Sequence, residues 1–175
     1  MNNSIRWLIV LGLATLVLAP MKVWALGQDA CTNGAVPRTT SSSHFTVIGN
    51  GGIVRHETTG LEWQRCAVGQ VWDGSTCTGA ASGHSWQGAL DIVAAAGDGW
   101  RLPNVNELRS IVEECRIMPA INRVVFPNTP SSYFWSASPY AGRSEYAWSV
   151  RLNYGNDRWN LKSNDYRVRL VRGGQ

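Results

Sequence analysis

Apolar and polar residues alternate along the first part of the chain. The alternation predicts strands over residues 45–48, 53–56 and 61–65, and glycine-rich turns at 49–52 and 58–60 separate them. In the third segment, Leu61 and Trp63 fall on one face. We expect a β-meander that leads toward the loop between Cys66 and Cys77.

The period changes to that of a helix in the middle of the chain. The pattern predicts one helix over residues 85–96, with Ser85 as its cap and Gly97 at its end. Asn104 and Glu107 have the spacing of a capping box, so a second helix is expected to begin there and to end near Cys115. Its solvent-facing residues are expected to be Glu107, Arg109, Glu113 and Glu114.

The last third, residues 133–175, again has the pattern of strands and turns. Strands are predicted over 133–136, 147–152, 158–161 and 166–171. Their framework residues are expected to be Phe134, Trp135, Trp148, Val150, Leu152, Trp159, Leu161, Val168 and Leu170, with Trp159 as the exception if one of the tryptophans is exposed. Two helices between a short N-terminal sheet and a C-terminal antiparallel sheet predict an α+β domain.

Residues 1–25 have the pattern of a secretory signal peptide. Arg6 precedes a short apolar run, and Val23 and Ala25 fit a cleavage site. A transmembrane helix needs about 20 apolar residues, and Pro20 and Lys22 interrupt this run too early. We therefore expect an exported protein without a stable membrane anchor, which stays in the periplasm, at the cell surface or in the medium. Residues 26–44 are expected to form an extended N-terminal arm.

Charge argues against a nucleic-acid partner. Removal of residues 1–25 takes Arg6 and Lys22 from the sixteen basic residues, which leaves fourteen against twelve acidic ones. The resulting net charge of about +2 is too small for nucleic-acid binding, and no run of basic residues supports it.

Four cysteines follow the predicted signal peptide, which favours disulfide bonds with three possible connectivities. Cys66 and Cys77 enclose a short loop that is easily bridged, so we predict Cys66–Cys77 and, by remainder, Cys31–Cys115. The chain has no C-x-x-C pair and no paired histidine spacing, so no metal site is predicted.

Polar and aromatic residues between the framework positions of the last third predict a binding surface, because such side chains suit recognition in loops. The alternative is an ordinary solvated face. The candidate binding residues are Ser138, Tyr140, Arg143, Ser144, Tyr146, Asn153, Asn156, Asp157, Trp159, Lys162, Asn164, Asp165 and Tyr166.

The sequence favours neither a calcium site nor a hydrolase. Calcium would need several oxygen ligands, but the available Asn and Asp side chains are also the commonest turn residues. The histidines, His44, His56 and His84, show no evident Ser or Cys partner for a hydrolase. We expect no cofactor and no enzymatic activity, and we interpret Arg101 and Glu107 as a cap with a fold-fixing salt bridge.

Five motifs in order resemble one family. They are Thr-Gly-Leu-Glu-Trp-Gln at 59–64, Trp-Arg-Leu-Pro-Asn at 100–104 with Glu-Leu at 107–108, Phe-Pro-Asn-Thr-Pro at 126–130, Tyr-Phe-Trp-Ser at 133–136 and Val-Arg-Leu-Val-Arg at 168–172. The chain is similar to the Lcl C-terminal domain family, formerly a domain of unknown function, over residues 45–175.

The resemblance implies a C-type lectin-like fold and an exported bacterial protein that acts in adhesion or ligand binding, with a protein or glycan partner. It also implies a likeness to the variable proteins of diversity-generating retroelements, whose hypervariable surface would correspond to residues 136–165. The alternatives are an oxidase related to the formylglycine-generating enzymes, and a structural envelope subunit without a small ligand. The oxidases use closely placed redox cysteines, and none lies beyond Cys115.

Overall fold

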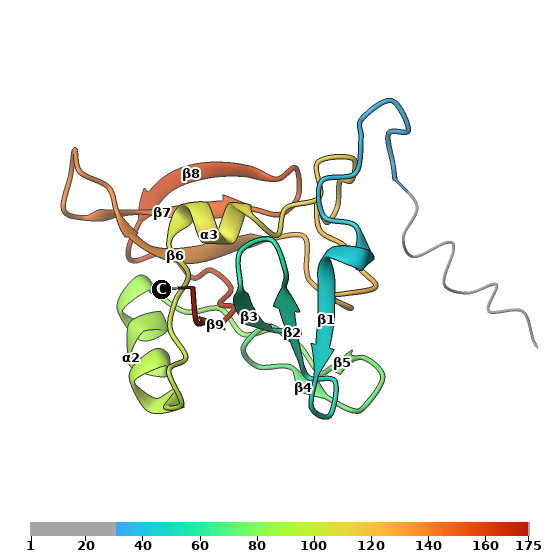
Figure 1. The fold of residues 1–175 in the computed structure, drawn as a ribbon. Helices are drawn as coiled ribbons and strands as arrows, with labels where there is room; N and C mark the ends of the chain where they lie inside the picture. The colour runs from blue at the N-terminus through green and yellow to red at the C-terminus, as the bar shows by residue number, and fades with distance from the viewer. Residues whose placement is uncertain (1–30, 175) are drawn as a thin grey trace, which may run out of the picture.

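A computed structural model describes residues 31–174 of the protein. The predicted signal peptide and the start of the predicted arm lie outside the described residues. In the described part, two helices and three short antiparallel sheets form a mixed α+β fold, which confirms the predicted fold class (Figure 1). None of the helices among residues 31–174 has the length and hydrophobicity needed to cross a membrane.

The first sheet joins the two ends of the domain. Its strand order is β1-β2-β3-β9, with all neighbours antiparallel. The strands are β1 (Phe45–Ile48), β2 (Ile53–His56), β3 (Leu61–Gln64) and β9 (Val171–Arg172). The meander is confirmed, but the prediction for the last strand was wrong. It covers only two residues, and it pairs with β3 in the N-terminal sheet.

A two-stranded ribbon that sequence analysis missed follows β3. It consists of β4 (Val71–Trp72) and β5 (Cys77–Thr78), and Cys77 pairs with Trp72 in the register. The Cys66–Cys77 disulfide closes this ribbon, and the second disulfide joins Cys31 to Cys115. The predicted pairing of the cysteines is confirmed.

Both helices begin where their caps predicted. The first, α2 (Trp86–Ala96), starts after Ser85, whose hydroxyl accepts a hydrogen bond from the Gly88 amide at 3.2 Å, and it ends at Gly97 with φ of +63°. The second, α3 (Val105–Arg109), has the complete capping box of Asn104 and Glu107.

The second helix is shorter than predicted. It stops at Arg109, and the following segment turns so that Val112 forms a β-bridge with Ile121. This turn buries Glu113, whose predicted solvent exposure was therefore wrong. The Glu113 carboxylate accepts hydrogen bonds from the backbone amides of Thr39 and Thr40, at 2.8 and 3.0 Å.

The N-terminal arm is consequently pinned to the domain and is not an independent extended segment. Its Thr40 side chain is buried, and its Thr32 amide donates to the Cys115 carbonyl at 2.9 Å. A short 3-10 helix, η1 (Ser42–His44), leads from the arm into β1.

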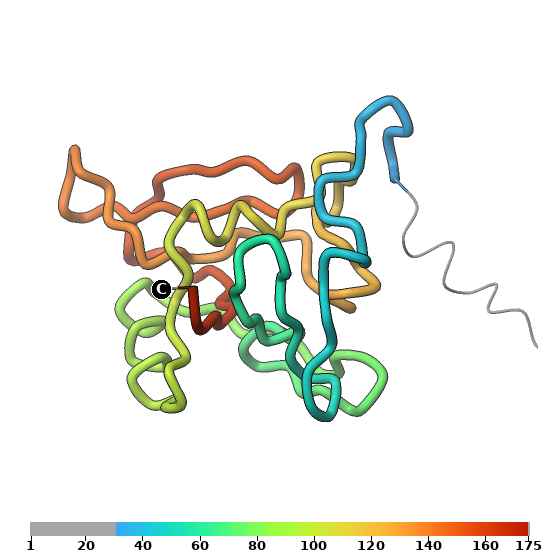
Figure 2. Tube along the Cα trace, viewed as in Figure 1, coloured from blue at the N-terminus to red at the C-terminus, as the bar shows by residue number. Residues whose placement is uncertain are grey.

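The third sheet has the order β6-β7-β8 and forms an upper layer in Figure 1. Its strands are β6 (Tyr133–Pro139), β7 (Tyr146–Arg151) and β8 (Asn156–Leu161), with Trp148 directly opposite Trp159. Helix α3 packs against β6 and β7, and α2 packs against β6. The hairpin tip between β6 and β7 projects beyond the sheet in Figure 2.

A fully buried arginine links the two main sheets. The Arg169 guanidinium donates to the carbonyls of Gln64 and Arg65 and to the Thr129 hydroxyl. It lies over the Phe126 and Phe134 rings at 4.8 and 5.8 Å, and burial lowers its pKa to about 9. The cation therefore holds segments of the core through carbonyl oxygens and aromatic faces.

Candidate functional site

Four aromatic rings contact one another at the hairpin end of the third sheet. We call Tyr140, Tyr146, Trp148 and Trp159 the aromatic cluster. Tyr140 and Trp159 lie nearly parallel, with centroids 5.4 Å apart, and Tyr146 meets Trp159 edge-on at 5.2 Å. Tyr140 also meets Trp148 edge-on at 5.6 Å. These offset and edge-to-face geometries are the favourable ones for aromatic pairs.

The strands place these rings together. Residues directly opposite each other in an antiparallel pair share a face, so Trp148 and Trp159 lie on the same side of β7 and β8. The Tyr140 amide donates to the Tyr146 carbonyl at 3.1 Å and closes the hairpin. A register shift between Trp135 and Pro139 accompanies the change from the buried part of β6 to this hairpin.

The cluster is open to solvent. Helix α3 packs against β6 and β7 and reaches β8 through the salt bridge of Arg109 with Asp157, near the start of that strand. Trp159 is 49% exposed and the neighbouring Leu161 is 41% exposed, while Trp148 is half-buried. Trp148 and Leu161 were predicted as buried framework positions, and for these two the prediction was wrong, whereas Trp159 was expected to be the exception among the tryptophans. The other six are buried: Phe134, Trp135, Val150, Leu152, Val168 and Leu170.

Positive side chains border the cluster. The Arg143 guanidinium lies 5.8 Å from the Tyr146 ring centroid, and the Lys162 Nζ donates to the Ser144 carbonyl at 2.7 Å. Lys162 also lies 4.3 Å from the Trp86 ring centroid. The structure therefore brings six of the candidate residues to one area: Tyr140, Arg143, Ser144, Tyr146, Trp159 and Lys162.

Three other candidates lie toward the opposite end of the β7–β8 hairpin. A six-residue strand spans about 17 Å between its end residues. Asn153 lies in the turn, and its carbonyl accepts a hydrogen bond from the Met118 amide. Asn156 begins β8, and Asp157 forms a salt bridge with Arg109 of α3 at 3.0 Å.

The remaining candidates mostly make contacts within the fold. The Ser138 hydroxyl accepts a hydrogen bond from the Val105 amide at the start of α3. The Tyr166 ring stacks on Tyr133, and its hydroxyl donates to Asn160 Oδ1 at 3.0 Å while it accepts from Asn164 Nδ2 at 3.1 Å. Asp165 is exposed.

The oxygen-bearing side chains weighed as calcium ligands do not converge on one point. Asp157 pairs with Arg109, and the Asn160 amide donates to the Ser149 hydroxyl. Within residues 31–174, no group of three or more His, Cys, Asp or Glu side chains has an arrangement that could hold a metal ion.

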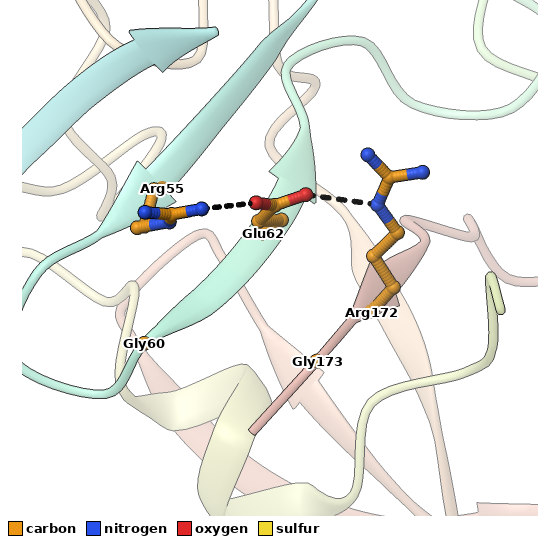
Figure 3. Close-up of a pocket in the computed structure, with 5 residues that line it drawn as sticks. All are labelled: Arg55, Gly60, Glu62, Arg172 and Gly173. Carbon is orange, nitrogen blue, oxygen red and sulfur yellow. Dashed lines mark hydrogen bonds and ion pairs between the residues drawn. The ribbon is translucent and has the colours of Figure 1, made fainter. Parts of the chain in front are cut away.

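A second surface feature lies on the first sheet, at a depression of about 480 Å³ lined by Arg55, Gly60, Glu62, Arg172 and Gly173. Figure 3 shows the Glu62 carboxylate between two arginines, with Arg55 at 2.7 Å and Arg172 at 2.9 Å. Hydrogen bonds from Arg55 and Arg172 lower the pKa of Glu62. These two ion pairs tie β2, β3 and β9 together. The sequence pattern did not reveal them, because Arg172 is far from Glu62 along the chain.

The predicted pair of Arg101 and Glu107 is formed, with two N–O distances of 2.7 Å. Burial acts to raise the pKa of Glu107, and the hydrogen bonds from Arg101 and the Asn104 amide outweigh it and lower the pKa. Arg101 also donates to the Gly173 carbonyl at 3.0 Å. The pair therefore fixes the C-terminal segment as well as the helix start.

One histidine has a partner that sequence analysis overlooked. The Ser82 hydroxyl lies 2.7 Å from His84 Nε2 and also donates to the Val68 carbonyl at 3.2 Å. The His84 backbone pairs with Tyr166, and its carbonyl accepts from Trp135 Nε1. Among the hydrogen bonds of the described residues, none links the His84 ring to a carboxylate. The contact holds the loop before α2 on the sheet.

Comparison with known protein families identifies one match. The model of the family described as the Lcl C-terminal domain matches residues 52–172. The matched region runs from the turn before β2 to the end of β9 and includes the whole aromatic cluster. No curated protein matches the sequence.

Proposed function

We propose that this chain, which belongs to the Lcl C-terminal domain family, is an exported binding or adhesion module without enzymatic activity, and that it holds a protein or glycan partner at its aromatic cluster. The two disulfides agree with this proposal, because such bonds persist in oxidising compartments. The lectin-like architecture and the likeness to retroelement variable proteins stay predictions from the resemblance.

The exposed aromatic cluster is the observation that carries the proposal. A tryptophan that is 49% exposed, in contact with two tyrosines and bordered by Arg143, is costly to leave in water without a partner. Trp, Tyr and Arg are also the residues that contribute most of the energy in binding interfaces. Their flat rings cover the apolar face of a peptide or a sugar, and the basic rim supplies hydrogen-bond donors.

The surrounding structure supports binding at a rigid surface. The cluster lies on the end of paired strands, and on the same face of the sheet the buried residues Phe134 and Val150 belong to the core. A surface that is already ordered loses little conformational entropy on binding. A structural envelope subunit would use the same chemistry and differ only in its partner.

The test replaces Tyr140, Arg143 and Trp159 together by alanine. Thermal unfolding reports folding, and pull-down from extracts of cell surfaces reports binding. We expect a folded variant whose binding falls at least tenfold. The matched control replaces Val47 and Val71, which are exposed apolar residues elsewhere, and it should bind like the wild type. Undiminished binding by a folded triple variant would refute the proposed site.

A further inference from the structure

The third sheet ends in an unpaired strand. β8 is its last strand, and it runs along the outer margin of the molecule in Figure 1. Its register involves only β7, over six residues. No other segment of residues 31–174 pairs with its outer side.

The register determines which backbone groups point outward. The Lys162 amide donates to the Glu145 carbonyl, which continues the β7–β8 register by one residue. In an antiparallel pair, hydrogen-bonded positions alternate. Asn156, Arg158 and Asn160 therefore point their backbone groups toward β7, whereas those of Asp157, Trp159 and Leu161 point away from it.

Most of these outward groups lack a partner. The Leu161 carbonyl accepts a hydrogen bond from the Asn164 amide. For Asp157 and Trp159, both the amide and the carbonyl have no hydrogen-bond partner within the described part of the chain. A row of free amides and carbonyls is a template for another strand.

The other sheet edges are covered or short. The outer side of β6 is closed by Arg167, whose carbonyl accepts from the Trp135 amide and whose amide donates to the Tyr133 carbonyl. β9 is bridged by Arg101. β1 has an open side, but it is only four residues long. Shortness and covering are the usual protections of edge strands, and β8 has neither.

Charge indicates the chemistry of the missing strand. In residues 133–174, seven basic residues stand against three acidic ones; without the buried Arg169 and without Arg172, which pairs with Glu62 on the first sheet, five basic residues remain. Arg158 is exposed on the face of β8 opposite to Trp159, and Arg143 lies in the adjoining hairpin tip. An added strand would thus meet an aromatic surface on one face and a guanidinium on the other.

We propose that β8 binds an extended acidic peptide segment of a partner protein as a fourth strand, with apolar side chains against Trp159 and acidic side chains against Arg158. This inference rests on the proposed function and narrows its partner to a protein. Strand addition obtains affinity from main-chain hydrogen bonds and specificity from alternate side chains. In the proposed peptide, apolar side chains that face Trp159 alternate with acidic side chains that face Arg158.

A second copy of the chain fits the same edge less well. If two β8 strands paired with Trp159 opposite Trp159, Arg158 would face Asn160 of the other copy, and no opposite charges would meet. If the two β8 strands paired with Arg158 opposite Arg158, two like charges would face each other, which destabilises a sheet. An acidic segment avoids both problems.

The first experiment uses a synthetic peptide on the wild-type protein. The probe has eight residues that alternate valine and glutamate, with blocked ends and a fluorophore, and anisotropy measures its binding. We propose an antiparallel strand, and in that arrangement the valines that lie against Trp159 point their amides at β8, whereas the glutamates point theirs away. Methylation of the valine amide nitrogens should weaken binding at least tenfold, while methylation of the glutamate amides should change it less than twofold. A peptide with lysine in place of glutamate should bind at least tenfold more weakly.

Two protein variants test the same edge. Trp159→Pro removes an amide that points away from β7, so it should reduce peptide affinity at least tenfold without breaking the β7 ladder. Arg158→Glu should reverse the preference and favour the lysine peptide. The matched control is Val47→Pro on β1, whose amide also faces outward because the Glu57 amide donates to the His44 carbonyl. If Trp159→Pro does not fold, the two methylated peptides still decide the question.

Equal binding of the two methylated peptides, or no binding of the parent peptide, overturns the inference. If the parent peptide fails to bind while the triple aromatic variant still loses its extract binding, the proposed function stands and strand addition fails. A dimer in sedimentation experiments that Trp159→Pro dissociates would assign the edge to a second copy, which also overturns the inference.

Discussion

Two tryptophans of the third sheet provide a matched test of framework against surface. Trp135 is fully buried, its Nε1 donates to the His84 carbonyl at 2.8 Å, and its ring lies 4.7 Å from the Tyr166 centroid. Trp159 is 49% exposed, and its ring contacts the rings of Tyr140 and Tyr146. Replacement of each by alanine removes the same atoms from two different environments.

The magnitudes follow from burial. A buried tryptophan removes roughly 150–250 Å² from water. At about 25 cal/mol per Å², this area corresponds to about 4–6 kcal/mol, which is an upper bound. Trp135→Ala also leaves a cavity and removes one of the two hydrogen bonds to the His84 carbonyl, which the Tyr166 amide still donates to. We therefore expect a loss of about 4–5 kcal/mol in unfolding free energy. Trp159→Ala leaves no cavity, because solvent fills the space, and should cost about 1–2 kcal/mol.

Urea denaturation of the oxidised protein measures both variants. The difference of about 3 kcal/mol should separate their midpoints with unchanged m values, and it corresponds to roughly 10 °C in Tm for a domain of this size. Trp148→Ala, at a half-buried position, should fall between them. A difference below about 1 kcal/mol between Trp135→Ala and Trp159→Ala would refute the assignment of Trp159 to the surface.

Three other outcomes are expected. Burial acts to raise the pKa of Glu113, but hydrogen bonds from the amides of Thr39, Thr40 and Cys115 outweigh it and hold the pKa below its ordinary value of 4.5. The hydrogen bonds between Glu113 and the arm should therefore be fully present above that value and be lost as the pH falls through the lowered pKa, while the Cys31–Cys115 disulfide keeps the arm tethered. A protection factor for amide exchange at Thr39, corrected for the intrinsic rate, that is the same at pH 7 and pH 3 would contradict this. Native protein should contain no thiol that reacts with Ellman's reagent, since both disulfides are formed; two or more titratable thiols would contradict the pairing. A calcium chelator should shift Tm by less than about 2 °C, and a larger loss that calcium restores would point to a metal site.

Local signals in the sequence predicted the starts of the elements well. The capping box of Asn104 and Glu107 and the Ser85 cap involve residues three apart, so their geometry depends on the local chain alone. The glycine turns at 49–52 and 58–60 also fixed the meander correctly. The short cysteine loop was enough to choose one of three disulfide connectivities.

Features that depend on distant segments were predicted poorly. Leu161 has the sequence pattern of a core residue, and it is exposed on the edge strand of the third sheet. Glu113 has the pattern of a surface residue, and it is buried because the arm folds over it. Six candidate binding residues were brought together, while Ser138 and Tyr166 are occupied within the fold, which no local pattern could reveal.

The pairing of β3 with β9 also has a kinetic consequence. Glu62 lies opposite Arg172, so the first sheet cannot be completed until nearly the whole domain has been synthesised. Contacts of such sequence separation slow folding, because the loop between them must close before they form. A nascent chain therefore leaves the ribosome with β1 to β3 unfinished and their edge unprotected. The edge of β3 is covered only when β9 pairs with it.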